Sequence, residues 1–153
     1  MGADAALDRL GIELPAPPTA LASYVPVRVQ GDLAHVSGQV PWDDRGELMY
    51  PGKVGATVTL DQARDGARRC GLQALAALRA ELGSLDRVTG VVQVWAWIAS
   101  DPSFTEQPKV ANAASDLLVE VFGETGRHAR AAVGVPVLPL DASVEVAVVA
   151  SIS

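Results

Sequence analysis

The pattern of apolar and polar positions along the chain predicts five strands, two main helices and one short helix. Apolar residues alternate with other residues where strands are expected, and they recur at three- or four-residue steps where helices are expected. In chain order, the predicted elements are the short helix Ala3–Leu10, the strands Tyr24–Gln30 and Leu33–Val40, a helix from Thr59 to Leu82, the strand Val88–Ile98, a helix from near Thr105–Pro108 to Phe122, and the strands Arg130–Val135 and Val144–Ile152. After the short helix, the order β-β-α-β-α-β-β is typical of an α+β fold.

Turn and capping signals support the boundaries of these elements. Gly31-Asp32 lies between the first two strands and indicates a hairpin. Pro41–Gly55 is rich in Gly, Pro and Asp and is expected to form a long loop. Thr59-Leu60-Asp61-Gln62 has the spacing of a capping box, and Gly83 is a natural helix end. The small residues along this helix suit close packing against a sheet.

Two of the predicted strands, Val88–Ile98 and Val144–Ile152, are largely apolar on both faces. Strict alternation in the strand Val88–Ile98 places Val92, Val94, Ala96 and Ile98 on one face and Val91, Gln93, Trp95 and Trp97 on the other. Two helices cover only one face of a sheet, so the other face needs a partner. The simplest partner is another copy of the chain. The pattern therefore predicts an oligomer and leaves the number of subunits open.

The length of 153 residues suggests one domain, residues 1–153, with an N-terminal lead-in over residues 1–20. The Pro-rich part of the lead-in, Leu14–Thr19, is expected to be extended. The N-terminus lacks the apolar region of a signal peptide, and no apolar run approaches the roughly 20 residues of a membrane helix. Cys70 is the single cysteine, which fits a reducing compartment. We therefore expect a cytoplasmic protein that does not contact membranes.

Charge and residue spacing argue against several other classes of protein. The chain has 12 Lys and Arg residues against 18 Asp and Glu residues, a net charge of −6. An acidic chain repels phosphate backbones, so nucleic-acid binding is not expected. The 2 histidines and the single cysteine are too far apart in sequence for a metal-site motif. The sequence also lacks a P-loop and a dinucleotide fingerprint, and we expect neither a metal nor a cofactor.

Several motifs, in order along most of the chain, resemble those of the reactive-intermediate deaminase family (RidA, or YjgF-type). They are Tyr24–Pro26, Val36–Pro41, Pro108–Asn112, His128–Val135, Leu138-Pro139 and Val144–Val146. The segment Gly126–Val135 is similar to the corresponding segment in a less characterised branch of this family. The resemblance implies a chorismate-mutase-like fold with two helices on one face of a mixed sheet, three subunits, and clefts between them. It also implies hydrolysis of reactive imines and enamines, such as 2-aminoacrylate, to 2-keto acids and ammonia.

The resemblance further implies which residues form the site. The family's substrate-binding arginine, tyrosine, helix asparagine and strand glutamate fall on Arg130, Tyr24, Asn112 and Glu145, while Ser37 and Gly38 are expected to line the cleft. The planar guanidinium of Arg130 would grip a carboxylate with two hydrogen bonds. Tyr24 and Asn112 would orient the substrate and water, and Glu145 would assist the water that attacks the C=N carbon.

The residues themselves leave other interpretations open. Arg130 lies among apolar residues, where an unpaired charge is costly, so it could instead form an ion pair with Glu145 across subunits. A histidine such as His128 can transfer protons near neutral pH, yet a loop histidine near two arginines is more often a surface or supporting residue. Cys70, in the middle of a helix, is expected to pack rather than to react.

Two other functions are consistent with the same clefts or the same family. The first is a protein that binds a small carboxylate without turnover, or a member dedicated to one biosynthetic pathway. Ala132 and Ala147 stand where many deaminase members carry Cys and a second Glu, and Arg127-His128 precedes the site where Pro is usual. The second is ribonuclease activity, an older description of the family, which the net charge of −6 disfavours.

Overall fold

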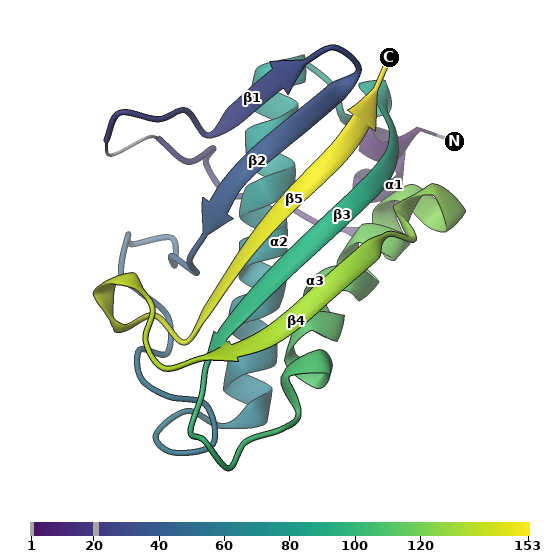
Figure 1. Ribbon diagram of the computed structural model, residues 1–153. Helices are drawn as coiled ribbons and strands as arrows, with labels where there is room; N and C mark the ends of the chain where they lie inside the picture. Colours follow the sequence, from purple (N-terminus) through teal and green to yellow (C-terminus); the bar gives the residue numbers. More distant parts are fainter. Residues whose placement is uncertain (1, 20–21) are drawn as a thin grey trace.

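The computed structural model describes residues 2–19 and 22–153. Its elements are α1 (Ala3–Leu10), β1 (Val27–Gln30), β2 (Leu33–Gln39), α2 (Leu60–Leu82), β3 (Val88–Ala99), α3 (Gln107–Phe122), β4 (Ala129–Val135) and β5 (Val144–Ile152), with short 3₁₀ turns at Leu85–Arg87, Gly123–Gly126 and Pro139–Asp141 (Figure 1). The predicted order of helices and strands is confirmed. The outermost residues of the predicted lead-in, 1 and 20, lie outside the described residues.

The five strands form one mixed sheet in the order β1-β2-β5-β3-β4. β3 and β4 run parallel, because α3 carries the chain back between them, and the other neighbouring pairs are antiparallel. α2 and α3 lie side by side on the same face of the sheet (Figure 1). This arrangement confirms the predicted α+β fold with two helices on one face. It also leaves β4, which carries Arg130, at an edge of the sheet.

Small residues allow α2 to pack closely on the sheet and on α3. Its first turn is closed by a complete capping box between Thr59 and Gln62, and it ends at Gly83, which has a φ of 82°. Gly71 faces α3 so closely that a Cβ there would lie 2.9 Å from the side chain of Leu117. Cys70 is fully buried in the same core, in agreement with its predicted packing role.

Two details of the predicted strands are wrong. β1 begins at Val27 rather than Tyr24, because Pro26 has no N–H for a strand ladder and the N–H of Tyr24 bonds instead to the carbonyl of Ala22. β3 does not alternate strictly, because its pairing with β5 shifts register between Val91 and Gln93. Val91 is therefore buried and Val92 exposed, the reverse of the predicted placement.

The face of the sheet opposite α2 and α3 exposes large apolar side chains. Trp95 of β3 is 37% exposed and Val133 of β4 is 46% exposed, although both lie in the middle of their strands. Exposed apolar side chains on one face of a sheet suit contact with another protein surface. The predicted oligomer remains a prediction. None of the helices in the described part of the chain has the length and apolar character needed to cross a membrane.

Candidate functional site

The structure divides the predicted site residues into two groups. Tyr24, Gly38 and Glu145 line one cavity of about 240 Å³, which we call the glutamate pocket. Its other lining residues are Pro18, Thr19, Pro26, Gln39, Val40, Trp42, Pro139 and Leu140. Arg130 and Asn112 contact each other elsewhere, at the edge of the sheet. Ser37 is in neither group.

Glu145 lies against a strand that has no side chain at the point of contact. A Cβ on Gly38 would lie only 2.1 Å from Oε1 of Glu145, so the absence of a side chain at position 38 makes room for the carboxylate. Glu145 is half-buried, and this burial raises the pKa of its carboxyl group above the ordinary value. A raised pKa makes the carboxylate a stronger proton acceptor, as a general base requires.

Ser37 and Tyr24 contribute to this pocket in different ways. The hydroxyl of Ser37 donates a 2.7 Å hydrogen bond to the carbonyl of Val25, and the N–H of Ser37 binds the carbonyl of Pro26 at 2.9 Å. Ser37 thus ties the segment that follows Tyr24 to β2, and it is not among the lining residues of the pocket. Tyr24 also lines the pocket and is 51% exposed, so its side chain is accessible to a ligand there.

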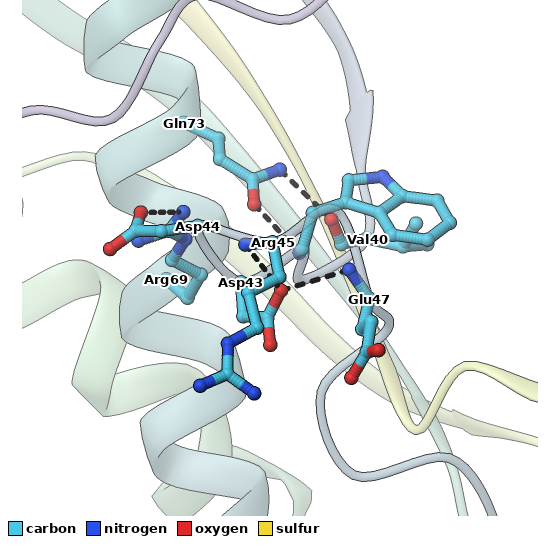
Figure 2. Close-up of polar contacts among 8 residues, drawn as sticks. Val40, Asp43, Asp44, Arg45, Glu47, Arg69 and Gln73 are labelled. Atoms are coloured by element: carbon cyan, nitrogen blue, oxygen red, sulfur yellow. Dashed lines mark hydrogen bonds and ion pairs between the residues drawn. The ribbon is translucent and has the colours of Figure 1, made fainter.

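A loop held by α2 forms a further wall of the pocket. The side-chain amide of Gln73 accepts a 2.8 Å hydrogen bond from the N–H of Trp42 and donates one of 2.9 Å to the carbonyl of Val40 (Figure 2). Arg69 forms a 2.9 Å ion pair with Asp44 of the same loop (Figure 2). Trp42, whose backbone N–H is held by Gln73, lines both the glutamate pocket and a neighbouring cavity of about 470 Å³.

Arg130 points to the helix-covered side of the sheet, where α3 holds it. Its partner in β3 is Val94, which is fully buried under the helices. Nη1 of Arg130 donates to Oδ1 of Asn112 at 2.8 Å and to Oγ of Ser115 at 3.1 Å. These are its hydrogen bonds to described residues, and both leave from Nη1. A guanidinium has donors on all three nitrogens, so the edge formed by Nε and Nη2 keeps its N–H groups.

His128 completes the group around Arg130. Its Nε2 lies 2.9 Å from Oγ of Ser115, and its Nδ1 lies 2.6 Å from the carbonyl oxygen of Gly126. Burial lowers the pKa of His128, the hydrogen bond to Gly126 opposes this effect, and the charge of Arg130 lowers the pKa further. We call Asn112, Ser115, His128 and Arg130 the arginine cluster.

Ser115 is absent from the residues predicted to form the site, although the sequence contains a signal for it. Asn112 and Ser115 are three residues apart and therefore lie on one face of α3, away from the apolar stripe of Val110, Ala114, Leu117 and Val121. Oδ1 of Asn112 accepts a hydrogen bond from Arg130, and the role of Asn112 in orienting substrate and water stays a prediction.

Arg130 and Glu145 do not meet within one chain. Glu145 pairs with Trp97 of β3 and alternates with Val144 and Val146, which are buried under the helices, so it lies on the opposite face of the sheet from Arg130. A site that uses both groups therefore needs two copies of the chain. No cluster of three or more His, Cys, Asp or Glu side chains able to hold a metal ion occurs within residues 2–19 and 22–153.

Comparison with known proteins places these features in context. The model of a family described as "YjgF/chorismate_mutase-like, putative endoribonuclease" matches residues 4–152. Protein TCP17 of Trypanosoma cruzi is 50% identical over 141 residues, which are 92% of this chain and 88% of that protein. A solved structure of a protein of unknown function from Agrobacterium tumefaciens is 40% identical, with a TM-score of 0.88 over 98% of this chain and 91% of that one. A structure from Shewanella oneidensis called "putative endoribonuclease" is 34% identical, with a TM-score of 0.94 over 99% of this chain and 100% of that one.

Proposed function

This chain belongs to the YjgF-type family, which includes the RidA deaminases, and from this premise we propose that it hydrolyses 2-imino acids and their enamines to 2-keto acids and ammonia. The observation that carries the proposal is the pattern of hydrogen bonds made by the guanidinium of Arg130. Asn112 and Ser115 occupy Nη1, while the edge formed by Nε and Nη2 is left for another acceptor. That edge has the geometry that binds a carboxylate with two parallel hydrogen bonds. A 2-imino acid carries such a carboxylate next to its C=N carbon.

The second half of the site comes from a neighbouring subunit. β4 is at the sheet edge, so Arg130 is close to the boundary of the subunit, whereas the glutamate pocket lies on the other face. In a homotrimer that buries the apolar face around Trp95 and Val133, the pocket of one copy would lie next to Arg130 of the next copy. The active sites would then be clefts between subunits.

The reaction needs modest assistance from the protein, because an iminium carbon is already electrophilic. Glu145 accepts a proton from water as the water oxygen bonds to the C=N carbon, which produces a carbinolamine. Glu145 then passes this proton to the amino group, the C–N bond breaks with its electron pair leaving on nitrogen, and the Glu145 carboxylate takes the hydroxyl proton as the ketone forms. Ammonia and the 2-keto acid leave. The raised pKa of Glu145 favours this exchange of protons, and the hydroxyl of Tyr24, which lines the pocket, orients the substrate.

The test is to generate imines from a panel of amino acids with an amino-acid oxidase and to measure keto-acid formation with and without the protein. We expect the wild type to accelerate hydrolysis and Arg130→Ala to lose both activity and binding of 2-ketobutyrate. Loss of a charged hydrogen-bonding partner costs on the order of 2–5 kcal/mol of affinity. Arg130→Lys keeps the charge but not the two-pronged geometry, and should bind weakly.

Three other outcomes would contradict the proposal in different ways. Binding of 2-ketobutyrate without turnover of any imine would identify a non-catalytic carboxylate-binding protein. Unchanged binding in Arg130→Ala would move the ligand away from Arg130. Cleavage of RNA by wild type but not by Arg130→Ala would favour the ribonuclease activity in the family description, against the net charge of −6.

A further inference from the structure

The hydrogen bonds around His128 have a defined direction. Nδ1 of His128 lies 2.6 Å from the carbonyl oxygen of Gly126, and a carbonyl oxygen only accepts hydrogen bonds. Nδ1 therefore carries the ring proton. In the neutral imidazole Nε2 then has a free lone pair, so the hydroxyl of Ser115, 2.9 Å away, must donate to it.

The hydrogen bond between Ser115 and Arg130 has a defined donor as well. With its proton given to His128, Oγ of Ser115 presents lone pairs to Nη1 of Arg130, which donates to it at 3.1 Å. Four groups thus form one series in which each donates to the next, from Arg130 through Ser115 and His128 to Gly126. Hydrogen bonds aligned in this way polarise and strengthen one another.

The far end of the series is fixed by packing. Gly126 is buried, and a Cβ on it would lie 2.4 Å from the carbonyl oxygen of Leu118, so its backbone lies directly against α3. Ser115 belongs to the same helix. The series therefore starts in β4, crosses to α3, and returns through the segment before β4 to a second point on α3. Such a closed arrangement leaves its members little freedom to move.

We propose that Ser115 and His128 are positioning residues that hold the Arg130 guanidinium with its Nε–Nη2 edge turned toward the substrate. Ser115 and Asn112 both accept hydrogen bonds from Nη1, which is on the opposite side of the guanidinium from that edge. The inference deepens the proposed function, on which it rests, because it assigns orientation of the carboxylate-binding group to two residues behind it. A guanidinium held in its binding orientation loses less freedom when a ligand binds, and affinity rises.

The test compares Ser115→Thr with Ser115→Val, which have nearly the same shape and differ in the hydroxyl. Two quantities are measured in the wild type and both variants. The first is the NMR order parameter of the Arg130 Nε–H bond without ligand, which reports fast motion of the guanidinium. The second is the affinity for 2-ketobutyrate. Melting curves show that each variant is folded.

We expect Ser115→Thr to match the wild type and Ser115→Val to show a more mobile Arg130 with about tenfold weaker binding. An equally rigid Arg130 in both variants would overturn the inference, whether or not 2-ketobutyrate binds. If the wild type binds no carboxylate, the proposed function fails, while the Arg130 signal still decides the positioning role. If Ser115→Val does not fold, His128→Leu against His128→Gln serves the same purpose, because Gln keeps an acceptor for Ser115.

Discussion

Gly38→Ala should reduce turnover strongly while leaving the fold intact. A Cβ at position 38 would lie 2.1 Å from Oε1 and 3.0 Å from Cδ of Glu145. Ordinary contact begins at 3.4 Å, so the carboxylate must move by more than about 1 Å, a misplacement that can reduce rates about a hundredfold. We expect a fall in kcat of that order, with KM for a carboxylate substrate much less affected because Arg130 is untouched.

The fold should tolerate this change for two reasons. The colliding atoms are at the end of a flexible side chain, which can rotate away. Gly38 is also outside the positive-φ positions, so alanine can adopt its backbone conformation. Gly→Ala at a compatible position stabilises a protein by roughly 0.4–1 kcal/mol through the unfolded state. The melting temperature of Gly38→Ala should therefore equal or slightly exceed that of the wild type.

The assay is keto-acid formation from an imine generated in situ, measured for wild type, Gly38→Ala, Glu145→Gln and the double variant. If Gly38→Ala acts by displacing Glu145, the double variant should be no slower than Glu145→Gln alone. Wild-type kcat in Gly38→Ala, or a double variant much slower than either single one, would refute the role given to the Gly38–Glu145 contact.

Three further predictions follow from the placement of the site residues. An equal mixture of Arg130→Ala and Glu145→Gln chains, unfolded and refolded together, should recover about a quarter of wild-type activity. The reason is that each cleft needs one intact residue from each of two subunits. No recovery of activity would place the site within one chain. Trp95→Asp should dissociate the oligomer, as measured by light scattering, without lowering the melting temperature, since this side chain is on the uncovered face of the sheet. Val94→Asp should unfold the chain, since its position is fully buried. A wild type that is already monomeric would refute the assembly. His128 has a lowered pKa in the folded chain, so the unfolded chain binds its proton more tightly, and stability present above about pH 6.5 is lost as the pH falls. The melting temperature of His128→Gln should therefore fall less with pH than that of the wild type. Identical pH profiles for the two proteins would contradict this prediction.

The sequence alone determined the elements and the fold of this protein. Thr59–Gln62 and Gly83 mark the ends of α2 because capping depends on a few neighbouring residues, and the structure contains both caps. Alternation and three- to four-residue periodicity predict the strands and helices because these patterns reflect burial on one side. They are wrong where a non-local feature intervenes, as at Val92, where a register shift against β5 breaks the alternation. The family follows from motifs spread along the chain, which the family match over residues 4–152 confirms.

The tertiary structure decided how the site residues are grouped. From the sequence, Arg130 and Glu145 look like members of one site, but the order β5-β3-β4 and the phase of each strand place them on opposite faces. The contact between Gly38 and Glu145 and the series from Arg130 to Gly126 also join residues far apart in sequence or on different elements. Local patterns specify which side of its own element a residue occupies. Which side chains then meet depends on strand order, register and helix packing, and these are set by the whole chain at once.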